Sequence, residues 1–168
     1  ISDVQKRFDW VLENPPIQSY TKMVERQGKK FERHNSDRWS WCDALYMAPP
    51  VWTGLWKATG DEKYLDYMVQ EWKQTSEWLW DEEESLYYRD NNYIGKATNK
   101  GKKIFWSRGN GWVFGGLVEI LQYLPQDNPH RPYFEALFKD MACALYKIQK
   151  KNGTWAPSLL DPDHIPQD

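Results

Sequence analysis

The stretch Trp39-Ser-Trp-Cys-Asp-Ala-Leu-Tyr-Met-Ala-Pro-Pro50 places one carboxylate, Asp43, among aromatic and apolar residues at the start of a helical pattern. An acid in such surroundings loses solvation, which disfavours its charged form and raises its pKa. A carboxylic acid that stays protonated near neutral pH can donate a proton in catalysis. The same position is also typical of a helix cap, so the stretch alone leaves both interpretations open. The neighbours of the acid in the sequence are Trp39, Trp41, Tyr46 and Met47.

The residues that follow predict a pair of helices joined by a tight turn. The helical pattern runs from Trp41 to Ala58, with Pro49 and Pro50 near its start, where proline is tolerated only in a first turn. Gly60 can take a left-handed C-terminal cap, and Asp61 can cap the next helix, which we expect to reach Glu82.

The rest of the chain is also predicted to be mainly helical, with apolar residues at helical spacing. Two regions, 28–38 and 85–111, are predicted as loops, the second with a short hairpin at 86–88. The Pro-rich tail, 159–168, is predicted to be ill-ordered. The further helices are expected over 2–13, 17–27 (a weaker pattern), 112–124 and 133–150.

Length and charge restrict the function classes. We expect the 168 residues to form one domain, 1–168, and the net charge of -2 argues against a nucleic-acid or acidic-membrane partner. The start of the chain is amphipathic and unlike a signal peptide, and no apolar run is long enough to span a bilayer. Cys42 and Cys143 are predicted to be buried, inert thiols. The histidines lack metal-ligand spacing, so we expect neither a metal nor a cofactor.

Aromatic content is the compositional outlier, with 11 Trp, 10 Tyr and 6 Phe. Large flat side chains fill cores, and they also form stacking surfaces for sugar rings, which expose apolar C–H faces. Composition alone favours core filling.

A second landmark is Ile104-Phe-Trp-Ser-Arg-Gly-Asn-Gly-Trp112. Its arginine, Arg108, lies between Trp106 and Trp112, and a guanidinium oriented by aromatic neighbours can bind a carboxylate with two hydrogen bonds. This arrangement suits a ring-shaped anion such as a uronic acid. An ion pair within the protein is the more frequent role of an arginine. A further arginine, Arg89, either reaches a cleft mouth or is solvated.

An internal repeat runs through these landmarks. The segments that begin at Trp39 and at Trp106 each lead into a helix, a turn and a second helix, and the repeat aligns Asp43 with Asn110. Helical hairpins cannot bury their apolar faces alone and need about three or more copies. We therefore expect this chain to be part of a larger ring of hairpins or to self-associate.

Three motifs in order closely resemble glycoside hydrolase family 105, the unsaturated rhamnogalacturonyl hydrolases, which are related to the family 88 unsaturated glucuronyl hydrolases. The motifs are 41–50, Thr59-Gly-Asp-Glu-Lys-Tyr-Leu65 and Phe105-Trp-Ser-Arg-Gly-Asn-Gly-Trp112. The resemblance implies an all-α fold, an (α/α)6 barrel of antiparallel helical hairpins, about half of which is present here.

The resemblance also implies a reaction that needs one acid. Ordinary glycosidases use two carboxylates, whereas this family hydrates the C4=C5 bond of a 4,5-unsaturated uronic acid. By this similarity Asp43 is the catalytic acid, and no metal or cofactor is required. The residues expected to bind the sugar are Trp41, Met47, Arg89, Trp106, Arg108 and Trp112.

A different class of function stays open. Half a barrel exposes broad apolar faces, so the chain could be a non-catalytic carbohydrate-binding or interaction module built from the same hairpins. A third alternative, a sugar epimerase on the same barrel, would be expected to use well-placed histidines, which this sequence lacks.

Overall fold

The computed structural model describes residues 2–14, 21–26, 29–34 and 39–165. For 21–26 and 29–34 it describes the backbone alone. Contacts divide the chain into two units, 1–38 and 39–168. The single domain expected over 1–168 stays a prediction, and each unit is described by itself.

In its described residues, the first unit contains one helix and one pair of strands. Helix α1 (Ser2–Glu13) confirms the helix predicted there. Strands β1 (Thr21–Arg26) and β2 (Lys29–His34) pair antiparallel, with Arg26 opposite Lys29.

The predicted helix over 17–27 is therefore wrong in its described part, and the predicted loop 28–38 contains a strand. A short, weakly patterned helix is marginal by itself. Two runs of residues separated by a Gly-containing pair, Gln27-Gly28, carry the alternative signal of a hairpin.

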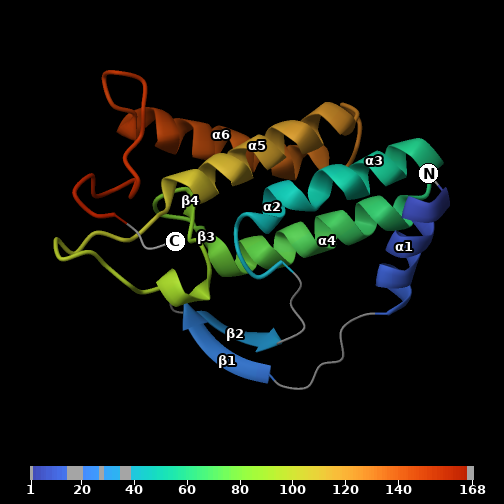
Figure 1. Cartoon of the computed structure of the whole chain (residues 1–168), viewed down its shortest axis with the longest axis horizontal. Helices are drawn as coiled ribbons and strands as arrows, with labels where there is room; N and C mark the ends of the chain where they lie inside the picture. The colour runs from blue at the N-terminus through green and yellow to red at the C-terminus, as the bar shows by residue number, and fades with distance from the viewer. Residues whose placement is uncertain (1, 15–20, 27–28, 35–38, 166–168) are drawn as a thin grey trace. The chain divides into compact units, whose positions relative to one another are not determined.

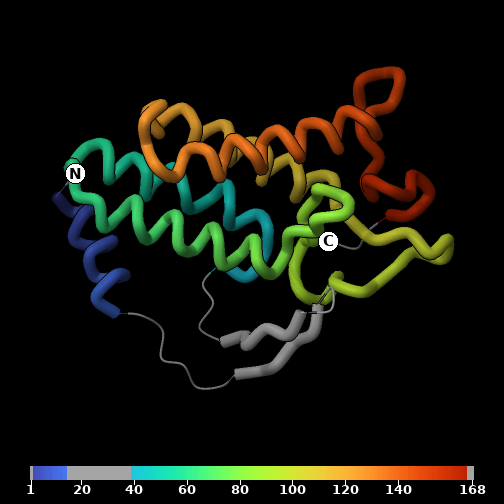
Figure 2. The backbone as a smooth tube through the Cα atoms, turned by 180° about the vertical axis from the view of Figure 1, so that it is seen from behind, coloured from blue at the N-terminus to red at the C-terminus, as the bar shows by residue number. Residues whose placement is uncertain are grey.

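The second unit is built from two antiparallel helical hairpins (Figures 1 and 2). Helix α3 packs on α4 and α5 packs on α6, while α2 and α3 both contact α5. Helices α2, α3 and α5 are thus neighbours, with α4 packed against α3 and α6 packed against α5. The bounds are α2 (Ala44–Met47), α3 (Pro49–Thr59), α4 (Glu62–Leu79), α5 (Ser107–Tyr123) and α6 (Arg131–Ile148).

The turn chemistry read from the sequence is confirmed in this unit. Pro49 and Pro50 occupy the first turn of α3, and the predicted continuous helix from Trp41 is divided at Ala48 into α2 and α3. Gly60 takes the left-handed conformation with φ 74°. The Asp61 side chain accepts a hydrogen bond from the backbone N–H of Lys63 at 3.2 Å.

Aromatic side chains fill much of the core, as composition favoured. Trp72 on α4 meets Phe134 on α6 edge-on, with ring centroids 5.5 Å apart, so this pair joins the two hairpins. The largest side chains with less than 2% exposure include Trp72, Tyr64, Tyr87, Phe105 and Phe134. Among the described residues, the structure has no helix with the length and apolar character needed to cross a membrane.

The connection between the hairpins is an anchored segment. Helix α4 ends at Leu79, short of the predicted Glu82, and strands β3 (Trp80–Asp81) and β4 (Leu86–Tyr87) pair antiparallel before the short 3-10 helix η1 (Asn91–Tyr93). Asp81 is 1% exposed and accepts hydrogen bonds from the Glu84 amide, the Tyr88 hydroxyl and the Lys103 ammonium. These bonds hold the hairpin against the residues that precede α5.

The tail predicted to be ill-ordered differs from this expectation over its described part. Leu159 and Asp161 are buried, and the Leu159 N–H donates to the Phe105 carbonyl at 2.9 Å. Lys100 forms ion pairs with both Asp161 and Asp163. The prolines of this segment prevent a helix but not an ordered structure. An antiparallel bridge between Trp106 and Ser158 and the ion pairs of Lys100 hold the segment in place.

The buried Asp81 should make stability depend on pH. Burial acts to raise the pKa of Asp81, but the hydrogen bonds from the Glu84 amide, Lys103 and Tyr88 outweigh it and lower the pKa below the ordinary 3.8. A lowered pKa stabilises the folded chain fully above the unfolded value, and this contribution is lost as the pH falls through the folded value.

We therefore expect Asp81→Asn to lower the free energy of unfolding at neutral pH, and the difference from wild type to shrink as the pH falls below about 4. Urea unfolding at a series of pH values measures this. The exposed Asp66 on α4 supplies the control, Asp66→Asn, for the loss of one charge. A wild-type difference that is constant with pH would contradict the assignment.

Candidate active site

Asp43 stands directly before α2 and is half-exposed. It occupies the capping position, yet among the described residues its side chain makes no capping hydrogen bond. Its Oδ1 lies 3.4 Å from the Cys42 thiol, which donates to it. The interpretation that the Asp43 side chain caps a helix is therefore wrong, and its carboxyl group can serve another role.

Arg108 lies in the first turn of α5, because this helix begins at Ser107 and not at the predicted Trp112. The predicted loop 85–111 therefore ends earlier. Gly109 and Gly111 are poor helix formers, and they concealed the helix start in the sequence. Since Arg108 and Trp112 are four residues apart on one helix, they share a face.

Trp106 is flanked by two cationic groups. The Arg108 guanidinium carbon lies 4.4 Å from the centroid of the Trp106 ring, and that of Arg89 lies 5.8 Å from it. Cation–π attraction orients such groups without neutralising them. The structure thus places a pair of positive charges against one indole.

Arg89 is half-buried, so it is not the simply solvated side chain that was one alternative. Its Nε lies 3.2 Å from Oδ2 of Asp90, and its guanidinium also lies over the Tyr93 ring at 5.4 Å. The other oxygen of Asp90 accepts a hydrogen bond from the backbone N–H of Asn92 at 2.7 Å. Sequence reasoning missed Asp90, whose signal is its position next to Arg89.

The segment that carries Asp43 runs beside the segment that carries Arg89. The Cys42 N–H donates to the Arg89 carbonyl at 2.8 Å, and Trp41 forms an antiparallel bridge with Asp90. Backbone hydrogen bonds therefore fix the catalytic candidate relative to one of the two arginines.

Helix α2 packs on α5 with unusually close approach. A Cβ atom on Gly116 would lie 2.1 Å from the Leu45 carbonyl oxygen, so only glycine fits there. One turn nearer the site, the Tyr46 and Trp112 rings lie with centroids 4.8 Å apart. The Trp112 and Gly116 positions thus hold α2 in place.

The predicted sugar-binding residues differ in exposure from the core aromatics. Trp41 is 52% exposed and Met47 is 56% exposed, and Arg108 is exposed as well. Trp39, in contrast, is buried, with its ring edge-on to Tyr67. The exposed apolar side chains of Trp41 and Met47 are therefore accessible to a ligand, and Trp39 belongs to the core.

Asn110, the repeat counterpart of Asp43, has a structural role that the sequence did not reveal. It is 0% exposed. Its Oδ1 accepts from the Tyr87 N–H at 2.8 Å, while its Nδ2 donates to the Tyr87 carbonyl at 2.9 Å and to the Trp106 carbonyl at 3.0 Å. Asn110 thus ties β4, and with it the approach to Arg89, to the start of α5.

The two cysteines differ from each other. Cys42 is buried as predicted, but Cys143 on α6 is exposed, so that prediction is wrong. The buried residues of α6 are Phe134, Leu137 and Met141. Cys143 lies two positions after Met141 and so faces away from this stripe. Among the described residues, no group of three His, Cys, Asp or Glu side chains could hold a metal ion.

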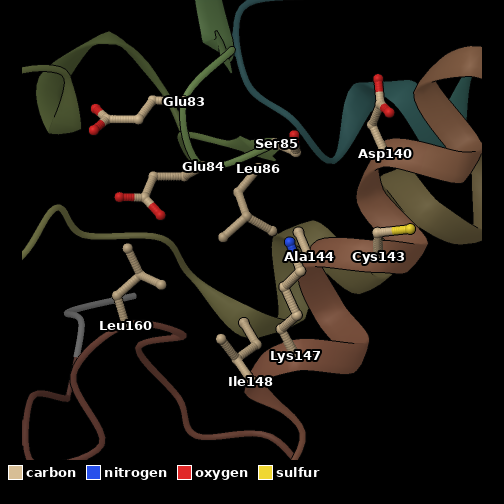
Figure 3. Close-up of a pocket in the computed structure, with 10 residues that line it drawn as sticks. All are labelled: Glu83, Glu84, Ser85, Leu86, Asp140, Cys143, Ala144, Lys147, Ile148 and Leu160. Carbon is tan, nitrogen blue, oxygen red and sulfur yellow. The ribbon is translucent and has the colours of Figure 1, made fainter.

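A pocket of about 280 Å³ lies between α6, the β3–β4 turn and Leu160, and Cys143 is one of its lining residues (Figure 3). It contains none of the predicted site residues. Leu86 and Ile148 provide apolar walls, and Glu83, Glu84 and Lys147 add charges. This pocket is therefore separate from the predicted site residues.

The comparisons define the class of protein. The pattern that describes glycosyl hydrolase family 88 matches residues 1–167, and the chain belongs to this family. The predicted relationship to families 105 and 88 is confirmed, as is the fold of helical hairpins from a six-hairpin barrel.

Particular relatives extend this assignment. The chain is 48% identical over 131 residues to an unsaturated 3S-rhamnoglycuronyl hydrolase of Formosa agariphila, covering 74% of this chain and 35% of the relative. A family 88 glycosyl hydrolase structure from Bacteroides vulgatus matches with a TM-score of 0.75 and 38% identity over 78% of this chain and 38% of that one.

A family 105 glycoside hydrolase structure from C. acetobutylicum shares the fold, with a TM-score of 0.65 and 22% identity over 92% of this chain and 42% of that one. The chain therefore spans between about a third and two fifths of the length of the proteins it resembles.

The contact between α2 and α5 can be tested with two glycines. We expect Gly116→Ala to lower the free energy of unfolding by about 1–3 kcal/mol, because its methyl group would overlap the Leu45 carbonyl. Gly54 on α3 has open space around its Cβ position, so Gly54→Ala should be neutral or stabilising by about 0.5–1 kcal/mol. Denaturant unfolding measures both. Equal effects of the two substitutions would contradict the close packing.

Proposed function

We propose that this chain carries the catalytic acid and part of the sugar-binding surface of a glycosidase that removes a 4,5-unsaturated uronic acid from an oligosaccharide. The finer proposal is an unsaturated galacturonic acid linked to rhamnose. Membership of family 88 and the name of the Formosa agariphila relative, an unsaturated 3S-rhamnoglycuronyl hydrolase, support this class of substrate.

One observation carries the proposal. The Asp43 carboxyl belongs to a segment hydrogen-bonded to Arg89, and the guanidinium groups of Arg89 and Arg108 both lie against Trp106. Such a surface combines a proton donor, an indole face and positive charge. These features suit an anionic sugar ring, since the indole packs on C–H groups and the guanidinium binds a carboxylate.

In the proposed reaction, Asp43 protonates C4 of the unsaturated sugar, and positive charge develops at C5. A water molecule then adds to C5 while the Asp43 carboxylate accepts a proton from it. The product is a hemiketal, which opens and expels the remaining sugar as an alcohol. Asp43 is thus both acid and base, and the glycosidic bond breaks without a carboxylate nucleophile.

Asp90 has a supporting role in this scheme. It is the nearest acidic side chain along the segment that pairs with Trp41, and ordinary glycosidases use two acids. Both of its oxygens are engaged, one by the Arg89 Nε and one by the Asn92 amide. It therefore orients Arg89 and does not attack the sugar.

The assignment of Asp43 predicts the effect of its amide. In the complete polypeptide that carries these residues, Asp43→Asn should lower kcat at least about 100-fold with an unchanged circular dichroism spectrum, because the amide cannot transfer the proton. Turnover is followed by loss of the ultraviolet absorbance of the C4=C5 enol ether in a lyase-generated disaccharide.

Two other outcomes are informative. Retention of most activity would remove Asp43 from the reaction. Binding of the disaccharide by the wild-type protein without loss of absorbance would support the alternative function, a non-catalytic carbohydrate-binding module.

Arg108 is predicted to act in binding. Arg108→Ala should raise KM for the unsaturated disaccharide about tenfold with a smaller change in kcat, because a charge-assisted hydrogen bond to the uronate is lost. Arg108→Lys keeps the charge without the planar pair of donors and should lie between the two. A KM that is unchanged in the alanine variant would contradict contact between Arg108 and the substrate.

A further inference from the structure

Cys42 directly precedes the proposed catalytic acid, and its side chain is engaged with it. The thiol sulfur is 0% exposed and lies 3.4 Å from Oδ1 of Asp43. A sulfur–oxygen distance of this size is typical of an S–H donor to a carboxylate, since sulfur is larger than oxygen. The proposed function as stated above gives this thiol no part.

Two neighbouring segments restrict Cys42. The Cys42 backbone N–H donates to the Arg89 carbonyl at 2.8 Å, which fixes the main chain on which the side chain stands. A Cβ atom on Gly109 would lie 2.6 Å from the sulfur. The main chain of Cys42 is thus fixed by a backbone hydrogen bond, and its sulfur packs closely against the position of Gly109 on α5.

The thiol is a donor at neutral pH. Burial raises the pKa of Cys42 well above its ordinary 9.0, and the negative charge of Asp43 and the hydrogen bond to it raise the pKa further. Among the described residues, Asp90 on the segment after β4 also acts on the thiol, and Arg89 is ion-paired to Asp90. A thiol that keeps its proton is neither a nucleophile nor easily oxidised.

We propose that Cys42 is a positioning residue for Asp43: its S–H group donates to Oδ1, which fixes the carboxyl orientation and leaves Oδ2 to exchange the proton with the substrate. This inference rests on the proposed function, since it assigns the second oxygen to the reaction. A carboxyl group that is already oriented loses less conformational freedom on reaching the transition state. The thiol is thus buried and unreactive, as the sequence predicted, and in this proposal it also orients the acid.

The kinetic test uses Cys42→Ala, Cys42→Ser and the control Cys143→Ala in the complete polypeptide. Loss of the donor should lower kcat about tenfold with KM nearly unchanged. It should also shift the high-pH limb of the activity profile to higher pH, because the charged carboxylate has lost a hydrogen bond. The hydroxyl of Cys42→Ser should restore most of both effects. The exposed Cys143 should be silent.

Two kinetic results would overturn the inference. One is a Cys42→Ala variant with the wild-type pH profile and kcat. The other is a Cys42→Ser variant that folds, by circular dichroism, and is as impaired as Cys42→Ala, since a role in packing alone would produce it.

A spectroscopic test separates this inference from the proposed function. The Raman difference between wild type and Cys42→Ala isolates the S–H stretching band of Cys42. The band of a hydrogen-bonded S–H group lies at lower wavenumber than that of a free one. Asp43→Ala should therefore move this band to higher wavenumber, and an unmoved band would overturn the hydrogen bond. Absence of wild-type turnover together with the expected band shift would overturn the proposed function instead.

Discussion

The close approach of α2 to α5 is the constraint on which the candidate site depends. Gly109 and Gly116 are seven residues apart, about two helical turns, and therefore lie on one face of α5. The absence of side chains lets the Cys42 sulfur and the Leu45 carbonyl lie against the helix backbone. Dispersion and steric fit along this seam position Asp43 near the start of α5. A bulkier residue at either position would separate the acid from the arginine.

Polar contacts organise the long connection between the hairpins in the same way. Asp81 anchors its beginning to Lys103, and Asn110 ties Tyr87 to α5. The Arg89 carbonyl then accepts the Cys42 amide. These three contacts join the connection to the segment before α5, to α5 itself and to the segment before α2. They hold the connection beside the candidate site.

The sequence predicted what depends on local chemistry. The left-handed Gly60, the capping Asp61 and the prolines at the start of α3 act through their own backbones, so each was correct. Features set by distant contacts were missed. Gly109 was predicted to be a loop residue. A helix can use a glycine at this position because of its contact with the Cys42 sulfur, which lies 67 positions earlier in the chain. Among the residues of the candidate site, Asp43, Arg89 and Arg108 were proposed from the sequence, whereas the contacts of Asp90 and Asn110 appear only in three dimensions.

The two positions that align in the predicted repeat, Asp43 and Asn110, lie in different surroundings. Asp43 and Asn110 align in the repeat, yet one carboxyl is half-exposed at a surface and one amide is enclosed between backbones. An amide both donates and accepts, which is what the Tyr87 N–H and carbonyl together require. A carboxylate in its place would meet that carbonyl with a negative charge and no proton to share. A carboxylate at position 110 is therefore incompatible with this contact to the β4 backbone, whereas the position of Asp43 can hold one.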